Sequence, residues 1–424
     1  MSHDHPVTPE AAPEPPPLLR QPEFLKLWAG QSISQLGDQV TLLALPLAAV
    51  LTLDASAAQM GFLVAAELLP HLFFSLLAGV WIERSARRRH LMIAADVGRA
   101  LLLASVPIAY AFDALTFPQL YAVAFGVGTF AVMFDVSWPT LFTTVVPRRD
   151  FVDANSKMSL SRSVSFVTGP SVAGFLVQVL SAPVTLLVDA FSYLGSALFL
   201  SRIRSQEPPV EQDGNGVLRS LRDGMRFVLR DELIRADLGC AATINLFNFV
   251  FHAIFVLYAT RELGVAPGTL GIALGAGAVG GILGALIAPR LERVLGIGRS
   301  MMLGSVLFPA PLILVPIASG SELQLGLMLG TAEFFSSVGV MIFDVSAASM
   351  TFLRTPDRIR ARTAGSFRFV NYGIRPIGAL IGGALGTVLG LQTALWIGVI
   401  GALAGVIWLL LSPVPRLREV AEAA

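Results

Sequence analysis

The sequence carries few charged residues for its length. Of its 424 residues, 14% are Asp, Glu, Lys or Arg and 54% are hydrophobic, whereas ordinary globular proteins carry about 25% charged residues. A soluble chain of this size has too few charges to cover so much apolar surface, so a soluble multidomain protein is excluded. The formal net charge is +1, and no Lys/Arg run is interleaved with aromatic residues, which argues against a nucleic-acid partner.

Cysteine and catalytic motifs are also scarce. Cys240 is the single cysteine, which excludes an intramolecular disulfide and a cysteine metal site. The five histidines form no H-E-x-x-H pattern, no G-x-x-x-x-G-K-[ST] phosphate loop occurs, and nothing matches a G-x-S-x-G nucleophile turn. We therefore expect neither an enzyme nor a bound cofactor or metal.

Long apolar runs, in contrast, are abundant. A membrane-spanning helix needs about 20 mostly apolar residues. Twelve such runs occur, over residues 25–51, 57–82, 90–111, 117–145, 159–180, 184–203, 236–259, 268–289, 299–318, 323–350, 364–388 and 391–411. They predict an all-α polytopic membrane protein.

A weak internal duplication divides these runs into two sets of six. Phe134-Asp135-Val136-Ser137 is repeated as Phe343-Asp344-Val345-Ser346, and Arg162 and Pro170 are matched by Arg368 and Pro376. Parallel repeats of this kind are typical of membrane transporters. We expect a first bundle over residues 24–203 and a second over 236–411, related by a pseudo-twofold axis.

The remaining segments are predicted to lie outside the bilayer. Residues 1–23 contain three consecutive prolines and no apolar segment of the signal-peptide kind, so we expect a disordered tail. Residues 204–235 form a linker whose apolar positions between Leu218 and Val228 share one helical face, which predicts an amphipathic helix along the inner leaflet. Residues 412–424 form the second tail.

Loop charges predict the orientation. Arginines cluster in the even-to-odd loops, for example Arg87, Arg148 and Arg358, whereas the opposite loops are nearly bare. This positive-inside pattern places both tails in the cytoplasm of a cell whose inner membrane holds the protein.

Polar residues inside the apolar runs are the candidates for function, because a charge near the bilayer centre costs roughly 2.5–3.5 kcal/mol. In the first run Gln31, Gln35, Asp38 and Gln39 recur at spacings of three and four residues, which places them on one helical face. Such a stripe indicates a water-filled pathway. We expect Asp38 to bind and release protons there.

Glu67 and Glu333 are further proton-coupling candidates in the middle of their runs. Glu67 lies one turn from His71, and the two either pair structurally or form a proton relay. Glu333 precedes Phe334 and is expected to face the cavity with it.

In the seventh run Asn245, Asn248 and His252 share a face and either line a site for an amphipathic ligand or bond neighbouring helices. Arg375, the deepest cation, either lines the cavity or pairs with an acid across a helix interface.

Other charged residues favour structural roles near the cytoplasmic face. Asp96 and Arg99 are one helical turn apart and predict an ion pair. Asp135 and Asp344, being duplicated, are expected to cap helices or to bridge to the duplicated arginines. Asp189 follows a loop closely, which predicts an interfacial position.

After the second run the chain reads Gly79-Val80-Trp81-Ile82-Glu83-Arg84-Ser85-Ala86-Arg87-Arg88. This segment resembles the G-x-L-x-D-R-x-G-R-R signature of the major facilitator superfamily, with Glu83 and Ala86 in place of the usual Asp and Gly. The resemblance implies the fold of two six-helix halves around a central cavity. It also implies that Gly79, Glu83, Arg84 and Arg87 belong to a charged latch at the cytoplasmic gate.

A second motif favours the exporters of that superfamily. Gly169-Pro170-Ser171-Val172-Ala173-Gly174 is similar to the GPxxGG core of drug–proton antiporters, with Ala173 replacing one glycine. The arginine that many drug exporters carry in the fourth span is missing from residues 119–145. The Gln-Leu-Gly-Asp stretch that ends at Asp38 looks more like the enterobactin, macrolide and multidrug exporter branch.

The function expected from these features is proton-coupled export of a hydrophobic or amphipathic small molecule by a monomer in the lipid bilayer. Two alternatives remain at this stage: an importer or facilitator of a polar solute, and a transport-inactive scaffold or sensor.

Overall fold

The computed structural model describes residues 17–83, 88–204 and 217–417. Within these ranges twelve helical segments are long and apolar enough to cross a membrane, as the apolar runs predict. The helices are α1 (Pro22–Leu53), α2 (Ala57–Glu83), α3 (Arg88–Ala111), α4 (Phe117–Val145), α5 (Phe151–Leu180), α6 (Ala182–Ser201), α7 (Val217–Arg230), α8 (Glu232–Leu257), α9 (Pro267–Leu295), α10 (Ile297–Leu307), α11 (Glu322–Arg354), α12 (Arg360–Leu389), α13 (Leu391–Leu403) and α14 (Val406–Leu410).

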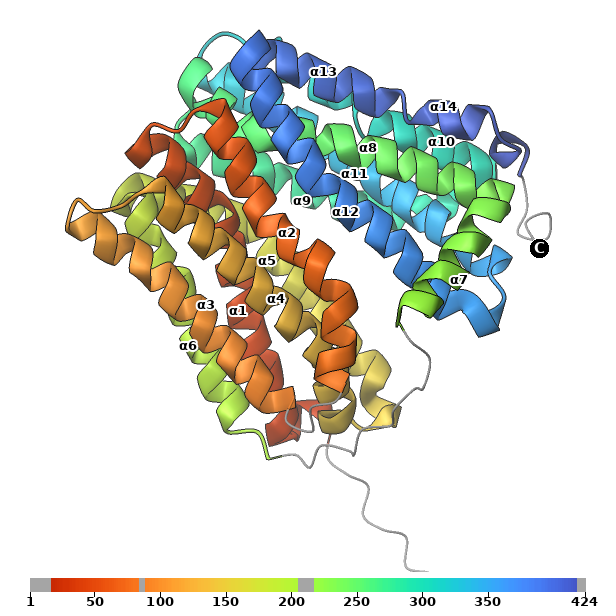
Figure 1. Ribbon diagram of the computed structural model, residues 1–424, viewed down its shortest axis with the longest axis horizontal. Coiled ribbons are helices and arrows are strands. Elements are labelled where there is room, and N and C mark those ends of the chain that lie inside the picture. Colours follow the sequence, from red (N-terminus) through yellow and green to blue (C-terminus); the bar gives the residue numbers. More distant parts are fainter. Residues whose placement is uncertain (1–16, 84–87, 205–216, 418–424) are drawn as a thin grey trace, which may run out of the picture.

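The helices form two groups that meet at one end. In the first group α1 packs against α5 and α6, and α3 packs against α4 and α6; in the second, α9 packs against α11, and α8 against α12 and α13. The groups converge at one end and diverge at the other (Figure 1). Helix α1 begins and α14 ends toward the diverging end (Figure 1), which therefore carries Pro22 and Val414 and is termed the tail end. The opposite end, with Asp54 and Asp113, is termed the far end.

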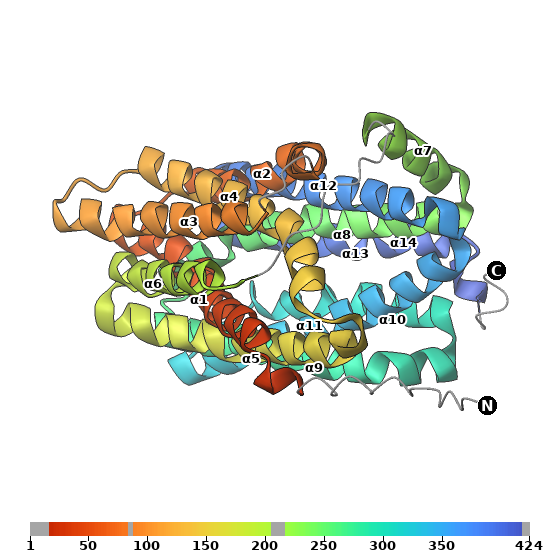
Figure 2. The same cartoon turned by 90° about the horizontal axis from the view of Figure 1, so that it is seen from below.

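Two helix pairs join the groups. Helix α2 lies beside α12, and α5 lies beside α9 (Figure 2). In the first pair, a Cβ atom placed on Gly61 would lie 2.6 Å from the carbonyl oxygen of Ala379 and 2.9 Å from the Cα atom of Gly383. Backbones approach this closely only where side chains are minimal, and such approach drives helix association in lipid. All three residues lie toward the far end of their helices.

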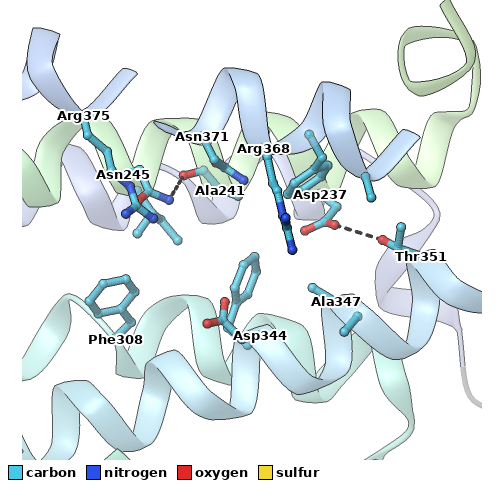
Figure 3. Close-up of a pocket in the computed structure, with 15 residues that line it drawn as sticks. Asp237, Ala241, Asn245, Phe308, Asp344, Ala347, Thr351, Arg368, Asn371 and Arg375 are labelled. Atoms are coloured by element: carbon cyan, nitrogen blue, oxygen red, sulfur yellow. Dashed lines mark hydrogen bonds between the residues drawn. The ribbon is translucent and has the colours of Figure 1, made fainter. Parts of the chain in front are cut away.

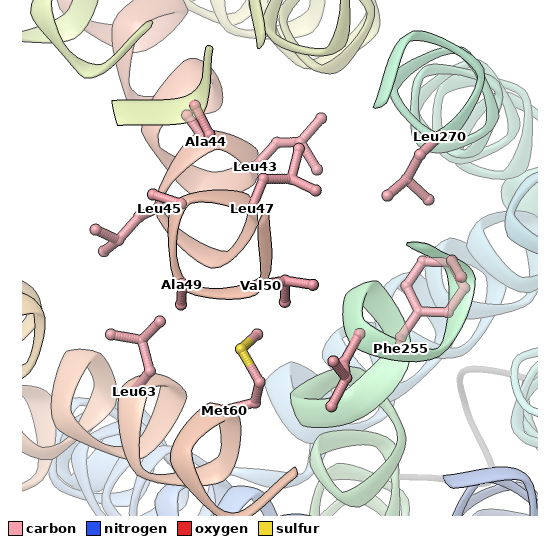
Figure 4. Packing of buried hydrophobic residues seen from close by; sticks show 14 of the residues in the cluster. Leu43, Ala44, Leu45, Leu47, Ala49, Val50, Met60, Leu63, Phe255 and Leu270 are labelled. Atoms are coloured by element: carbon pink, nitrogen blue, oxygen red, sulfur yellow. The ribbon is translucent and has the colours of Figure 1, made fainter. Parts of the chain in front are cut away.

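A cluster of buried apolar side chains fills the far end between the groups. Leu47 and Val50 of α1 belong to the same cluster as Met60 of α2, Phe255 of α8 and Leu270 of α9, and Figure 4 shows these side chains converging. Close packing of this kind leaves no room for water. The far end is therefore closed by apolar contacts.

Several element boundaries differ from the apolar runs, and two of the differences have a clear local cause. The run over residues 299–318 is broken, because Pro309 and Pro311 lack the N–H groups that would continue the ladder; α10 ends at Leu307 and a 3₁₀ turn follows over Ala310–Leu314. The run expected to start at residue 236 starts at Glu232 instead. There the Asp231 carboxylate caps the helix by accepting the backbone N–H groups of Leu233 and Ile234 at 3.1 Å.

Helix α7 packs on α12. The Ser366 hydroxyl donates to the carbonyl of Leu221 at 3.0 Å, and Arg362 pairs with Asp223 at 3.3 Å. A Cβ atom on Gly224 would lie 2.2 Å from the carbonyl oxygen of Arg362. The predicted position of this helix along the inner leaflet stays a prediction, but its apolar side has a protein partner.

Candidate functional site

Each helix group holds a cavity in its tail-end half. The N-half cavity, of about 380 Å³, is lined by α1, α4 and α5. The C-half cavity, of about 330 Å³, is lined by residues of α8, α11 and α12 together with Phe308. Both cavities contain charged side chains, and they lie away from the closed far end.

The polar stripe of α1 faces the N-half cavity. Gln31, Gln35, Asp38 and Gln39 all line it, in keeping with the single helical face that their spacing predicts. The Asp38 side chain is 41% exposed, although it lies well inside a spanning helix. That exposure is to the cavity, so water or a ligand can reach the carboxylate.

Behind Asp38 lies a buried cation. The Arg99 side chain is 5% exposed, and its guanidinium lies 2.6 Å from the Asp96 carboxylate and 3.9 Å from that of Asp38. It also lies over the rings of Tyr193 at 4.2 Å and Phe134 at 4.9 Å. The predicted Asp96–Arg99 ion pair is thus present, but Arg99 also faces Asp38 and is not confined to a surface pair.

Tyr193 and Asp189 of α6 extend this network. The Tyr193 hydroxyl donates to the Asp38 carboxylate, and Thr41 of α1 donates to Asp189. The expected interfacial position of Asp189 is wrong, because the residue is fully buried against α1. Gly37 makes this contact possible, since a Cβ atom there would lie 2.1 Å from both the Asp189 carboxylate and the Ser192 hydroxyl.

The C-half cavity combines charged and aromatic side chains. Arg375 of α12 donates to the amide oxygen of Asn245 of α8 at 3.0 Å, and Thr351 donates to Asp237 at 3.4 Å. Arg368 extends from α12 into the space between them, with Asp344 on the facing helix α11 (Figure 3). Arg375 therefore lines the cavity and donates to an amide oxygen. Among the described residues it forms no ion pair with an acid within 4 Å.

The internal duplication places equivalent charges in the two cavities. Asp135 and Arg162 line the N-half cavity, and Asp344 and Arg368 line the C-half cavity. All four residues are exposed. The expected bridges are absent: among the described residues, none of the four forms an ion pair within 4 Å.

Three candidates in the middle of the spans lie elsewhere. Glu67 and Glu333 are not among the residues that line either cavity. Glu333 is buried where α11 meets Gly277 of α9. His71 stacks on Tyr372 with ring centroids 5.9 Å apart, so it bridges α2 and α12.

Three further candidates for the substrate cavity, Phe334 of α11 and Asn248 and His252 of α8, also lie outside the two cavities. Phe334 lies in an apolar groove between α9 and α11, against the expectation that it faces the central cavity with Glu333. His252 meets the ring of Phe251 edge-on at 5.5 Å. Neither His252 nor Asn248 lines either cavity, so on this face Asn245 is the residue that does.

The antiporter-like motif forms part of the junction between the groups. Pro170, Ala173 and Gly174 are buried in α5, and a Cβ atom on Gly174 would lie 2.3 Å from the carbonyl oxygen of Pro267 and 3.1 Å from the Cα atom of Gly271 in α9. Gly169 instead approaches Gln39, where a Cβ atom would lie 2.3 Å from that of Gln39.

The latch motif is described only in part. Gly79 and Glu83 belong to the last turns of α2, whereas Arg84 and Arg87 lie outside the described residues. Asp135 and Asp344, the other expected gate acids, line the cavities.

Two residues of the site, one in a cavity and one behind it, escape sequence reasoning. Asp237 lines the C-half cavity, but in the sequence it stands at the expected start of the seventh span and looks like a residue of the membrane surface. The helix in fact starts earlier, and the sequence signal for that start is a single residue, the capping Asp231. Tyr193 is an ordinary aromatic residue in an apolar run. Nothing local in the sequence signals its contact with Asp38, 155 residues away.

Comparisons with known proteins agree with this architecture. Residues 14–424 match the family described as transmembrane secretion effector. The multidrug efflux pump Tap of Mycolicibacterium fortuitum is 29% identical over 94% of this chain and 97% of that protein, and the uncharacterized MFS-type transporter YfiS of Bacillus subtilis is 25% identical over 90% and 89%. A bacterial homologue of the iron transporter ferroportin, solved in an inward-facing state, superposes with a TM-score of 0.76 and 17% identity over 93% of this chain and 99% of that one. The chain belongs to the transmembrane secretion effector family and is a major facilitator superfamily transporter, a multi-pass membrane protein and not an enzyme.

Proposed function

We propose that the protein is a secondary exporter, which moves hydrophobic or amphipathic small molecules out of the cell in exchange for protons by alternating access. The observation that carries this proposal is the asymmetry of the two ends. The groups touch through glycine backbones and an apolar cluster at the far end, while cavities that contain charged side chains occupy both groups toward the tail end. A transporter open to one side at a time requires this kind of asymmetry.

The loop charges supply the direction. Arg148, Arg149 and Arg358 lie at the tail end, whereas Asp54 and Asp113 lie at the far end. By the positive-inside rule the tail end is cytoplasmic. The described conformation then opens to the cytoplasm, which is the state in which an exporter takes up its cargo.

The composition of the cavities supports an amphipathic cargo. Amide, hydroxyl and charged side chains line the N-half cavity. Aromatic residues line both cavities: Phe134, Trp138 and Phe166 in the N-half cavity, and Phe308, Phe343 and Phe367 beside Asp344 and Arg368 in the C-half cavity. A molecule with an apolar body and one polar end could contact the aromatic rings with its body and the charged side chains with its polar end. In such sites apolar contacts provide most of the surface, and a few polar groups orient the ligand. The similarity to the multidrug efflux pump Tap also supports an amphipathic cargo.

Asp38 is the proposed proton carrier. It is the one candidate of the three mid-span carboxylates that lines a cavity, and it contacts Arg99 and Tyr193 from behind. The ionised carboxylate attracts Arg99, and protonation removes that attraction. Protonation of Asp38 therefore changes how tightly α1 is held to α3 and α6, which links proton occupancy to the packing of the first group. Glu67 and Glu333 line neither of the two cavities in this conformation.

Transport by inside-out membrane vesicles tests the proposal. An imposed gradient with an acidic lumen should drive uptake of a fluorescent amphipathic dye, and uptake should stop when an ionophore collapses the gradient. Vesicles from cells without the protein serve as the control. Uptake that continues unchanged without the gradient would exclude proton coupling. Accumulation of a polar solute by intact cells, with no dye transport, would favour import instead.

A further inference from the structure

A separate cationic pocket lies at the tail end of the first group. Its volume is about 500 Å³, and it is formed where α1 and α3 begin and α6 ends. Its lining residues include four cations, Lys26, Arg89, Arg202 and Arg204, and a single acid, Glu23. These four cations and one carboxylate give the pocket a net charge of +3.

Two of the four cations bind the last carbonyl groups at the end of α6. Lys26 donates to Glu23 at 2.8 Å and to the carbonyl of Arg202 at 2.9 Å, and Arg89 donates to the carbonyl of Ile203. Cations at the last carbonyls of a helix are favourable there. Lys26 and Arg89 therefore have a structural role whether or not a ligand binds.

The other two cations have no such role. The side chains of Arg202 and Arg204 are exposed, and neither guanidinium forms an ion pair within 4 Å in the described part of the chain. The one acid nearby is engaged, because Glu23 accepts from Lys26 and from the backbone N–H of Arg204 at 2.8 Å. Two guanidinium forks beside one pocket fit a phosphate group, whose oxygens they bind in a bidentate manner.

The surroundings of the pocket identify the source of the phosphate. Helices α3 and α6 lie on the side of the first group that faces away from the second (Figure 1), and this pocket shares no lining residue with the two transport cavities. Ser201 of the pocket continues along α6 into Leu198, Leu194 and Phe191 at spacings of three and four residues, and these three apolar side chains are exposed. They share a helical face, which in a spanning helix faces lipid.

We propose that this pocket binds the phosphate of an anionic phospholipid whose acyl chains lie along Leu198, Leu194 and Phe191 of α6. Basic pockets at the ends of spanning helices bind such headgroups. The site is independent of the transport cavities, so the proposal holds for any cargo and any coupling ion.

Lipid retention by the full-length protein tests the site. The purified protein is mixed with phosphatidylglycerol and phosphatidylcholine of equal chain length, and the lipids that stay bound are identified and quantified by native mass spectrometry. The wild type should retain phosphatidylglycerol in preference. Arg202→Gln/Arg204→Gln should lose affinity for it by about 10- to 30-fold, because each cation near an anionic headgroup contributes about tenfold or less. Equal retention of both lipids by the wild type, or undiminished retention by the variant, would overturn the proposal.

A matched variant and a soluble competitor complete the experiment. Arg290→Gln/Arg293→Gln removes the same charge from exposed positions of α9 and should leave retention unchanged; a loss equal to that of the first variant would mean that overall charge is responsible. Arg202→Lys/Arg204→Lys keeps the charge but not the guanidinium forks, so it should retain more lipid than the glutamine variant and less than the wild type; this partial retention would show that the substituted pocket still folds. Glycerol 3-phosphate should not displace the lipid at millimolar concentration. Full displacement would identify a soluble phosphate site and overturn the lipid assignment.

Discussion

The hydroxyl of Tyr193 in α6 donates a hydrogen bond to the carboxylate of Asp38 in α1, and the guanidinium of Arg99 lies 4.2 Å from the centroid of the same tyrosine ring. Tyr193 therefore contacts both the anion and the cation of the buried network through different parts of one side chain. The three residues come from three helices, so the network joins α1, α3 and α6 at the depth of the N-half cavity.

Tyr193→Phe should separate these two contacts. The ring that faces Arg99 is kept, and the hydrogen bond to Asp38 is lost. We expect transport to fall by about tenfold or more, since a hydrogen bond to a charged group contributes about 1.5–3 kcal/mol. Initial transport rates per molecule of protein measure this effect. Tyr121→Phe, which removes a weak 3.5 Å contact of a far-end tyrosine, should transport normally; equal losses in both variants would contradict a specific role of Tyr193.

Arg99→Leu should destabilise the first group. Asp96 is fully buried, and loss of its partner leaves an uncompensated buried charge, which costs about 3–5 kcal/mol. We expect a lower yield of folded protein and a lower melting temperature in detergent. Asp96→Asn/Arg99→Leu removes both charges and should recover part of the loss. A double variant that is less stable than Arg99→Leu alone would show that Asp96 has a better partner than Arg99.

Gly174→Val should open the far end. Even a Cβ atom at this position would lie 2.3 Å from a backbone oxygen of α9, so α5 and α9 cannot keep their present distance. The state closed at the far end becomes costly, and the population should shift toward outward opening.

Labelling from outside reports this shift. In a Cys240→Ala background, Leu270→Cys places a thiol in the buried far-end cluster, and a membrane-impermeant maleimide should label it faster when Gly174→Val is added. Gly195→Val is the matched control, because a Cβ atom on Gly195 meets nothing within 4 Å. Equal labelling in all three proteins would show that the glycine contact does not hold the far end closed.

The spans and the polar stripe could be predicted because both are local patterns. Apolar runs of about 20 residues follow from the thickness of the bilayer, and the spacing of Gln31, Gln35 and Asp38 determines their common face. The sequence also indicates that the two halves carry equivalent charges, because Asp135 and Arg162 recur at matching positions as Asp344 and Arg368.

What could not be predicted depends on contacts between distant helices. Glu67, Glu333 and Asp38 look alike in the sequence, as acids in the middle of apolar runs, but only the packing of α2 and α11 decides that the first two lie away from the cavities. The same holds for Asp189, whose burial depends on the absence of a side chain at Gly37 of another helix. Phe334 directly follows Glu333, but adjacent residues on a helix point about 100° apart, so the direction of one side chain does not predict that of the other.

The role of Asp38 as proton carrier is tested most directly by counting protons. Purified protein is reconstituted in liposomes that contain a pH-sensitive dye, and proton movement is recorded when an amphipathic substrate is added on the tail-end side. Wild type and Asp113→Asn, which changes an exposed far-end loop acid whose left-handed backbone (φ 52°) suits Asn, should both move protons with the substrate. Asp38→Asn should bind the substrate but move no protons with it. Substrate-driven proton movement at the wild-type rate in Asp38→Asn would contradict the account.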